Sequence, residues 1–142
     1  MTSTDWDPSF IDGLASCNQL VLLNNRGIGG STDNGQSFDI ATLAEDVALV
    51  IETLGFERMS VMGWSTGGFV AQSLALQHPD RVDKLVLLST DSGGIDADVA
   101  SAAVWSKLVD TSGTPREQAH RLLSLFFQMT SPNLFIKCSA AS

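Results

Sequence analysis

Short apolar runs alternate with amphipathic runs along the N-terminal two thirds of the chain. Residues 19–24, 58–64 and 84–89 are short and mostly apolar, which is typical of buried strands. Between the first two runs, apolar residues recur at helical spacing from Leu43 to Leu54, and Gly55 follows. The pattern therefore predicts a helix over residues 40–54.

A second helix is predicted over residues 66–77, with Val70, Ala71 and Leu74 facing inward. It ends before Pro79, because the residue that precedes a proline disfavours the helical conformation. A short helix is expected over residues 9–16, after Asp7-Pro8. Strands that alternate with helices predict a parallel α/β sheet of three strands with right-handed crossovers.

The strand pattern stops after Gly94. Residues 98–109 and 115–128 read as two helices, the second very apolar, and no clear pattern follows. We expect an α/β part over residues 1–94, a helical segment over residues 95–130 and an irregular tail over residues 131–142.

Composition narrows the class of protein. Of 142 residues, 44% are hydrophobic and 17% charged, which is typical of a globular chain. The formal net charge of −8 argues against nucleic acid and anionic membrane surfaces as partners. No apolar run is long enough for a membrane span, and no secretory signal is visible. Cys17 and Cys138 lie far apart without metal spacing, so a reducing cytoplasm is expected.

One pentapeptide carries the strongest chemical signal. Gly63-Trp64-Ser65-Thr66-Gly67, followed by Gly68, lies between a predicted strand and a predicted helix. Such a turn is the nucleophile elbow of serine hydrolases, where glycines permit a sharp bend that exposes the serine hydroxyl. The Thr66 amide, at a helix N-terminus, would face a developing oxyanion. The alternative is a strand-to-helix turn without chemistry.

A serine nucleophile needs a base, and the chain has two histidines. His78 ends the helix that begins after Ser65, which puts it about 20 Å away at ~1.5 Å per residue, too far to act. The expected role of His78 is that of a helix-terminal residue. His120 falls in the second C-terminal helix, where a partly exposed structural position is expected.

Asp91 follows the third predicted strand and is the candidate acid, which would orient a histidine. The alternative is a turn residue before Ser92-Gly93-Gly94. Trp64 and Trp105 are candidates for an apolar substrate pocket, although packing is the more frequent use of tryptophan.

Two further features carry no predicted chemistry. Glu45 and Asp46 are expected to be solvated positions on a helix. The glycines of Gly27-Ile28-Gly29-Gly30 resemble part of a dinucleotide-binding loop. However, Thr32 occupies the position of the third glycine in that motif, and no helix is predicted to begin there. We therefore expect no nucleotide, no other cofactor and no metal.

Three stretches together resemble the α/β-hydrolase family, in particular its small esterase, lactonase, haloperoxidase and aminopeptidase members. They are residues 25–31, residues 63–68, and His78-Pro79-Asp80-Arg81-Val82 before the third strand. The family usually has an aspartate where Asn24 stands, in a structural role. The resemblance covers residues 1 to about 128 and implies that the segment after Gly94 begins a helical cap.

The resemblance also implies what this chain lacks. Family members carry the histidine and the usual acid on loops after later strands, and a second oxyanion donor on a loop before the present Met1. The chain therefore resembles the centre of a family domain. In the family's sheet order, a strand absent here lies between residues 19–24 and 58–64, which leaves unpaired strand edges.

The sequence is therefore compatible with two functions. The first is hydrolysis of a small-molecule ester, lactone or amide through an acyl-enzyme on Ser65, impaired or lost in this truncated chain. The second is a non-catalytic relative that acts as an interaction module or forms homo-oligomers through its unpaired strand edges.

Overall fold

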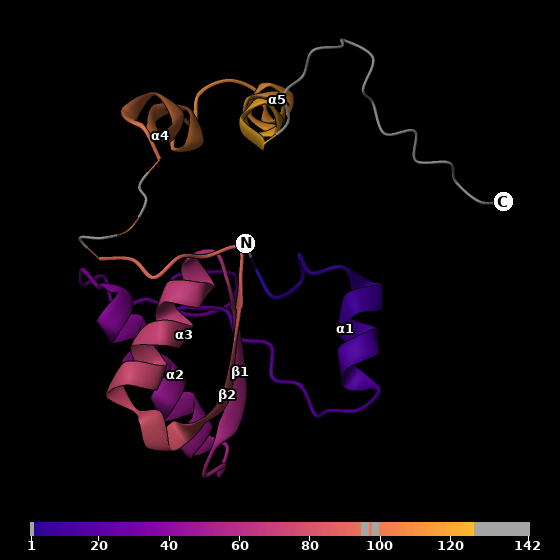
Figure 1. Ribbon diagram of the computed structural model, residues 1–142, viewed down its shortest axis with the longest axis vertical. Coiled ribbons are helices and arrows are strands. Elements are labelled where there is room, and N and C mark those ends of the chain that lie inside the picture. The colour runs from indigo at the N-terminus through magenta and orange to yellow at the C-terminus, as the bar shows by residue number, and fades with distance from the viewer. Residues whose placement is uncertain (1, 95–96, 98–99, 127–142) are drawn as a thin grey trace, which may run out of the picture. The chain divides into compact units, whose positions relative to one another are not determined.

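The computed structural model describes residues 2–94, 97 and 100–126 (Figure 1). The chain divides into two compact units, Met1–Ala97 and Asp98–Ser142. Each unit is described by itself below.

A two-stranded parallel sheet forms the centre of the first unit. Strand β1 (Met59–Trp64) pairs with β2 (Val82–Leu88) in a register that runs from Met59 opposite Val82 to Trp64 opposite Leu88. Helix α3 (Thr66–Gln77) and the short 3-10 helix η1 (Pro79–Arg81) connect the two strands. The α/β architecture and the parallel pairing are confirmed, with fewer strands than the sequence predicts.

Residues 19–24 belong to no helix or strand, so the prediction of the first strand is wrong, whereas the second and third predicted strands are found as β1 and β2. A strand needs a hydrogen-bonded neighbour, and this segment is separated from β1 by an apolar groove of about 1220 Å³. The apolar residues of the segment correctly predicted that it lies near the sheet. They did not show whether it forms hydrogen bonds with a neighbouring strand.

Helices α2 (Ile40–Thr53) and α3 lie on the same side of the sheet, as Figure 1 shows. The Asp39 carboxylate accepts a hydrogen bond from the Thr42 amide and caps α2, which holds the pKa of Asp39 below its usual value. Gly55 follows α2 at a φ of 77°, in the left-handed region that glycine adopts without strain.

The core of the first unit lies between α2, α3 and the sheet. Leu74 is fully buried, and Val70 and Ala71 face inward on the same helix as predicted. The other buried apolar residues are Leu43, Ala44, Ala48, Ile51 and Val82. This small core covers one face of the sheet.

Helix α1 (Pro8–Ala15) lies on the other side of the sheet (Figure 1). Asp7 caps it by accepting a hydrogen bond from the Phe10 amide, and Pro8 occupies the first turn as the sequence predicts. Aromatic rings join α1 to the end of β1: Trp6 stacks on Phe10 at 5.6 Å and meets Trp64 at 5.7 Å between ring centroids.

The second unit contains helices α4 (Ala102–Leu108) and α5 (Pro115–Phe126). Thr114 and Glu117 form a capping box at the start of α5, because the Glu117 carboxylate accepts hydrogen bonds from the Thr114 amide and hydroxyl. Arg121 joins α5 to the preceding loop through an ion pair with Asp110. The predicted tail over residues 131–142 lies outside the described residues.

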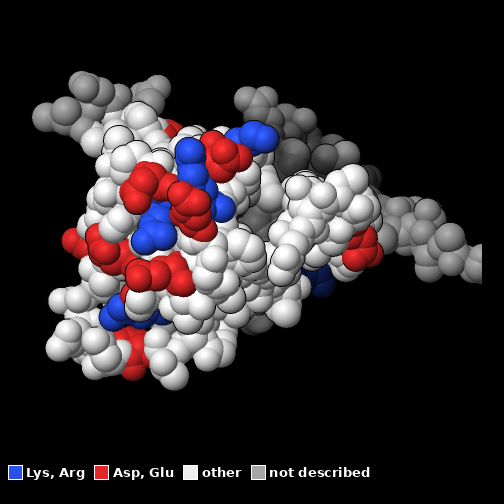
Figure 2. Space-filling model, turned by 90° about the horizontal axis from the view of Figure 1, so that it is seen from below, with Lys and Arg blue, Asp and Glu red and all other residues white. Residues whose placement is uncertain are grey.

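Charged side chains interleave on the surface. Figure 2 shows one face of the molecule on which acidic and basic residues alternate within the same patch instead of forming a basic cluster. None of the helices in the described part of the chain is long and apolar enough to cross a bilayer.

Candidate active site

The turn between β1 and α3 has the sharp bend that the sequence predicts. Ser65 adopts φ 52° and ψ −121°, a conformation that residues with a side chain rarely occupy. Two backbone hydrogen bonds hold it there: the Ser65 amide donates to the Leu88 carbonyl at 2.9 Å, and the Gly68 amide donates to the Ser65 carbonyl at 2.8 Å. The neighbouring strand and the first turn of α3 together impose the strained backbone.

Two of the three glycines beside Ser65 are needed for space. A Cβ atom on Gly63 would lie 2.2 Å from the Gly67 carbonyl oxygen, and one on Gly68 would lie 2.4 Å from the Thr90 methyl group. A Cβ atom on Gly67 would meet nothing within 4 Å. The glycines at positions 63 and 68 therefore allow the strand, the turn and the helix to approach closely.

The Ser65 side chain is exposed and lines one end of the apolar groove beside β1. Thr66 begins α3, and its amide is one of the first helical N–H groups, which have no partner within the helix. The positive end of the helix dipole lies at this donor. The turn therefore provides an electropositive site beside the serine hydroxyl, where a negatively charged oxygen is stabilised.

Trp64 also lines this groove and is 41% exposed. Its ring lies 5.7 Å from the ring of Trp6, which in turn stacks on Phe10 of α1, and the sequence did not predict this contact. Trp105 lies on α4 in the other unit and is 53% exposed. Trp64 and Trp105, both candidates for an apolar substrate pocket, thus belong to different units.

Asp91 serves as a turn residue after β2. Its carboxylate accepts a hydrogen bond from the Gly93 amide at 2.7 Å, and its backbone carbonyl accepts one from the Gln72 side chain at 2.7 Å. Side-chain hydrogen bonds to a backbone amide two residues onward are typical of aspartate in turns. No histidine contacts Asp91 within the described residues.

His78 bridges the end of α3 to α2. Its Nε2 atom lies 3.0 Å from the Glu45 carboxylate, so Glu45 has a partner that the sequence did not predict. Ser65 and His78 flank the 12 residues of α3, which separates them by roughly 18 Å along the helix axis. The expected exclusion of His78 as a base for Ser65 agrees with this geometry.

Asp46 is half-buried at 31% exposure, which differs from the solvated position that the sequence predicts, whereas Glu45 is exposed as predicted, at 59%. The two carboxylate oxygens of Asp46 accept hydrogen bonds from Nε and Nη2 of Arg26, at 2.8 and 2.6 Å. Sequence spacing on α2 cannot show this pair, because the two residues meet only when the glycine-rich loop folds against the helix. The backbone carbonyl of Asn24 accepts a hydrogen bond from the Ser31 hydroxyl at 2.7 Å, which joins the two ends of this loop.

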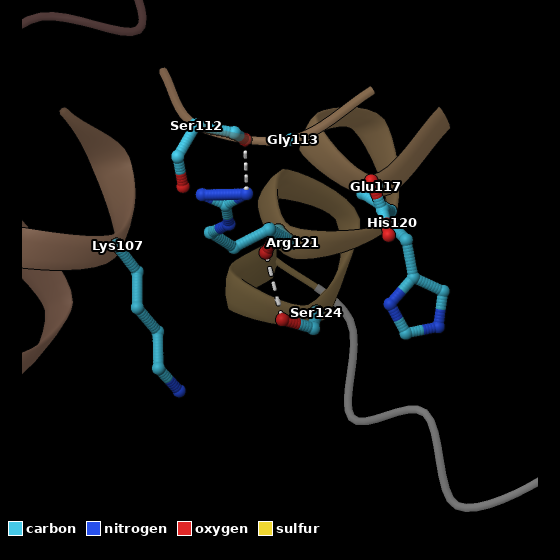
Figure 3. A pocket seen from close by; sticks show the side chains of 7 residues that line it. All are labelled: Lys107, Ser112, Gly113, Glu117, His120, Arg121 and Ser124. Carbon is cyan, nitrogen blue, oxygen red and sulfur yellow. Dashed lines mark hydrogen bonds between the residues drawn. The ribbon is translucent and has the colours of Figure 1, made fainter. Parts of the chain in front are cut away.

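His120 lies in the second unit and lines a shallow pocket of about 490 Å³. Figure 3 shows its ring directed away from Arg121, whose guanidinium donates a hydrogen bond to the Ser112 carbonyl at 2.7 Å. The described residues offer His120 no hydrogen-bonded carboxylate. His120 therefore lacks, within its own unit, the orienting group that a catalytic imidazole uses.

Thr90 is a contributor to the turn that the sequence did not reveal. Its side chain packs against Gly68, and its hydroxyl oxygen is buried without a hydrogen-bond partner among the described residues. Thr90 lies two residues after the end of β2, where threonine carries no distinctive signal. Only the approach of β2 to the start of α3 shows its role.

Metal-ligating residues do not gather in the described part of the chain: no three His, Cys, Asp or Glu side chains there lie close enough to hold an ion. The chemistry that the described residues can offer at this turn is that of a serine hydroxyl beside backbone amides.

A family model described as the alpha/beta hydrolase fold matches residues 2–138. The chain belongs to the α/β-hydrolase fold family. The predicted resemblance is confirmed, and the strand–Ser65–helix turn lies inside the matched region.

Two curated proteins of similar sequence illustrate this membership of the α/β-hydrolase family. The provisionally named carbamate hydrolase RutD of Caulobacter sp. (strain K31) is 36% identical over 89 residues, which are 62% of this chain and 33% of the relative. The provisionally named non-heme bromoperoxidase BpoC of Mycobacterium tuberculosis (strain H37Rv) is 37% identical over 86 residues, which are 60% of this chain and 32% of the relative.

The crystal structure of a hydrolase from Pseudomonas aeruginosa PA01 superimposes with a TM-score of 0.65 at 28% identity, over 87% of this chain and 45% of that one. The matches therefore span about a third of the two curated relatives and under half of the solved hydrolase.

Proposed function

We propose that Ser65 is the nucleophile of an acyl-transfer reaction in which a small-molecule ester, lactone or amide is hydrolysed. The observation that carries this proposal is the exposed Ser65 hydroxyl on a strained turn between β1 and the N-terminus of α3. Membership of a hydrolase family supports the class of reaction, and the carbamate hydrolase name of one relative supports attack on a carbonyl carbon.

In this reaction the Ser65 oxygen attacks the carbonyl carbon, and the Thr66 amide donates a hydrogen bond to the oxygen that becomes negative. The serine proton passes to water, the bond from the carbonyl carbon to the leaving oxygen or nitrogen breaks, and the alcohol or amine takes up a proton. Water then attacks the acyl-enzyme, which releases the carboxylic acid and restores the Ser65 hydroxyl. Trp64 lies beside the serine in the apolar groove, which supports a role in holding the acyl part of the substrate. No cofactor takes part in this proposal.

We further propose that the reaction runs slowly in this chain by itself. His78 lies at the far end of α3 and is paired with Glu45, and Asp91 is engaged by the Gly93 amide. Without a base the serine hydroxyl is a weak nucleophile, and loss of the base lowers turnover by several orders of magnitude in serine hydrolases. The helical segment over residues 95–130, which contains His120, is proposed as the cap of the fold.

The test uses the full chain with p-nitrophenyl acetate and with a fluorophosphonate probe. We expect slow labelling that disappears in Ser65→Ala and persists in Ser89→Ala, because Ser89 is an exposed serine at the end of β2 with a similar positive φ of 48°. Equal labelling of Ser65→Ala would refute the assignment of the nucleophile. Fast turnover that His120→Gln abolishes would refute the proposal of a missing base.

A second candidate function is that of a non-catalytic interaction module. The apolar groove beside β1 favours it, because large hydrophobic side chains are exposed there: Leu22 is 46% and Leu23 41% exposed. Homo-oligomers through the strand edge would be one form of such association. We place the protein in the reducing cytoplasm, which the exposed free thiol of Cys17 supports.

A further inference from the structure

The segment that follows β2 packs against the start of α3. The Thr90 side chain lies so close to the helix that a Cβ atom on Gly68 would fall 2.4 Å from the threonine methyl group. The Phe69 ring covers Gly93, where a Cβ atom would fall 3.2 Å from the ring. Gly93 adopts a φ of 64°, a left-handed conformation that glycine occupies without strain. Residues 90–93 therefore fit closely over the first turn of α3.

Gln72 supplies the polar part of this contact. Its Nε2 atom donates hydrogen bonds to the Asp91 carbonyl at 2.7 Å and to the Gly68 carbonyl at 3.3 Å. Gln72 lies one helical turn after Gly68, and helical side chains tilt toward the N-terminus, so its amide lies over the first turn of α3. The Thr90 hydroxyl is buried without a partner among the described residues. Within those residues, Gln72 therefore makes the single hydrogen bond between residues 89–94 and α3.

The Ser65 turn needs such support because its backbone is strained. Ser65 has φ 52° and ψ −121°, and a conformation of this kind persists only where neighbouring contacts enforce it. The Leu88 carbonyl, which accepts a hydrogen bond from the Ser65 amide, holds the turn from the strand side. Leu88 ends β2, so the position of its carbonyl depends on the course of the chain after the strand. Gln72 fixes that course by joining Asp91 to α3.

We propose that Gln72 is a positioning residue for Ser65, an inference that rests on the proposed role of Ser65 as nucleophile. By holding the segment after β2 against α3, Gln72 keeps the Leu88 carbonyl on the Ser65 amide and the serine hydroxyl exposed. Gln72 does not line the groove beside Ser65, so it acts through the turn and not on the substrate. Its loss should therefore slow the attack of the serine oxygen without changing the affinity for the reactant.

The experiment compares three variants of the full chain with the wild type. Gln72→Glu keeps the length of the side chain but places a carboxylate, which cannot donate a hydrogen bond, against two carbonyl oxygens. Gln72→Met has a similar unbranched shape with neither an N–H donor nor a charge. Gln77→Glu is the matched control on the same helix, because the Gln77 amide donates to the Ser73 hydroxyl at 2.6 Å in an exposed position. Circular dichroism establishes that each variant is folded.

Hydrogen exchange of the Ser65 amide, measured by NMR, reports on the turn without any chemistry. This amide donates to the Leu88 carbonyl, so its exchange requires the turn to open. We expect the Ser65 amide to exchange about tenfold faster in both Gln72 variants than in the wild type, and to be unchanged in Gln77→Glu. The amide of Leu74, a fully buried residue within α3, should keep its wild-type exchange in every variant.

Labelling by the fluorophosphonate probe measures the effect on the serine. We expect both Gln72 variants to lower the rate constant of Ser65 labelling at saturating probe by about tenfold. The concentration of probe that gives half the maximal rate should stay the same, because Gln72 lies outside the groove. Gln77→Glu should match the wild type in both quantities.

Acid separates hydrogen bonding from packing. Between about pH 7 and about pH 4.5, the carboxyl introduced by Gln72→Glu takes up a proton and can donate again, because the facing carbonyl oxygens raise the pKa of a carboxyl above its ordinary value of about 4.3. We expect the labelling rate of Gln72→Glu, relative to the wild type at the same pH, to recover in acid. The relative rate of Gln72→Met should stay low, because methionine has no group that titrates.

The outcomes distinguish this inference from the proposed function. Unchanged labelling of Ser65 in the folded Gln72 variants would overturn the positioning role and leave the nucleophile in place. The same pH response in Gln72→Glu and Gln72→Met would also overturn it, because loss of packing would then explain both. If the wild type shows no labelling that Ser65→Ala removes, the proposed function fails, and exchange of the Ser65 amide then decides by itself whether Gln72 holds the turn.

Discussion

Arg26 and Asp46 form a two-pronged ion pair that fastens the glycine-rich loop to α2. Two guanidinium nitrogens meet the two carboxylate oxygens, and the side chains of Arg26 and Asp46 are 22% and 31% exposed. The Phe38 ring lies 6.0 Å from the same guanidinium. Because this loop follows residues 20–23, the pair fixes one wall of the groove relative to the helix that lines it.

The pair predicts an acid-sensitive contribution to stability. Hydrogen bonding to Arg26 holds the pKa of Asp46 below its ordinary value of 3.8. The stabilisation is therefore complete only at a pH well above 3.8, and it is lost as the pH falls through the lowered pKa of the folded state. We expect Asp46→Asn to cost about 1 kcal/mol of unfolding free energy at pH 7 and much less in strong acid, as measured by urea unfolding across this range.

The control for this prediction is Asp80→Asn. Asp80 is also near an arginine, but its contact with Arg81 is long at 3.8 Å and its carboxylate is 78% exposed. A change in stability with pH that is the same for both variants would contradict a specific role of the Arg26 pair.

The close approach of Gly63 to Gly67 predicts that a single methyl group disrupts the turn. A Cβ atom at position 63 would overlap the Gly67 carbonyl oxygen, which is backbone and cannot move without shifting α3. We expect Gly63→Ala to lower the unfolding free energy by about 2–3 kcal/mol in chemical denaturation. Gly67→Ala is the matched control, because open space surrounds that position, and should be neutral or slightly stabilising.

The backbone conformation of Ser65 predicts a conflict between stability and reactivity. Glycine adopts φ 52° and ψ −121° more readily than serine or alanine. Ser65→Gly should therefore be more stable than Ser65→Ala by about 1 kcal/mol, although both lack the hydroxyl. Thermal unfolding of the two variants measures the difference, and equal stability would mean that the turn relaxes without cost.

Asp91 gives a prediction that separates a turn residue from a catalytic acid. Asparagine keeps a side-chain oxygen that can accept the hydrogen bond of the Gly93 amide, whereas alanine does not. If Asp91 is a turn residue, Asp91→Asn should match the wild type in probe labelling of Ser65, and Asp91→Ala should lose about 1 kcal/mol of stability. Loss of labelling in folded Asp91→Asn would instead indicate an acid.

The elements of this chain followed from local patterns. The sequence predicts α3 over the residues where it is found, because Ser65-Thr66 and His78-Pro79 mark its ends. It also predicts α1 from Asp7-Pro8 and a serine turn from the glycines around Ser65. These features depend on backbone sterics and on contacts within a few residues, which a sequence records directly.

Contacts between distant segments were decided by the tertiary structure. The polar spacing of α2 was compatible with solvated carboxylates, yet folding brought Asp46 to Arg26 and Glu45 to His78. The same holds for Trp6 beside Trp64 and for Thr90 against Gly68. Each pair is separated by many residues, so its formation depends on how the elements stack and not on local preference.

By itself, the sequence determined the family and the sharp serine turn between β1 and α3, because both depend on short motifs whose geometry is local. Only the tertiary structure decided that residues 19–24 form no strand and that an apolar groove lies between them and β1. The physical reason is that an apolar run indicates only that its side chains favour burial. A strand also requires a neighbouring segment with free backbone groups at hydrogen-bonding distance.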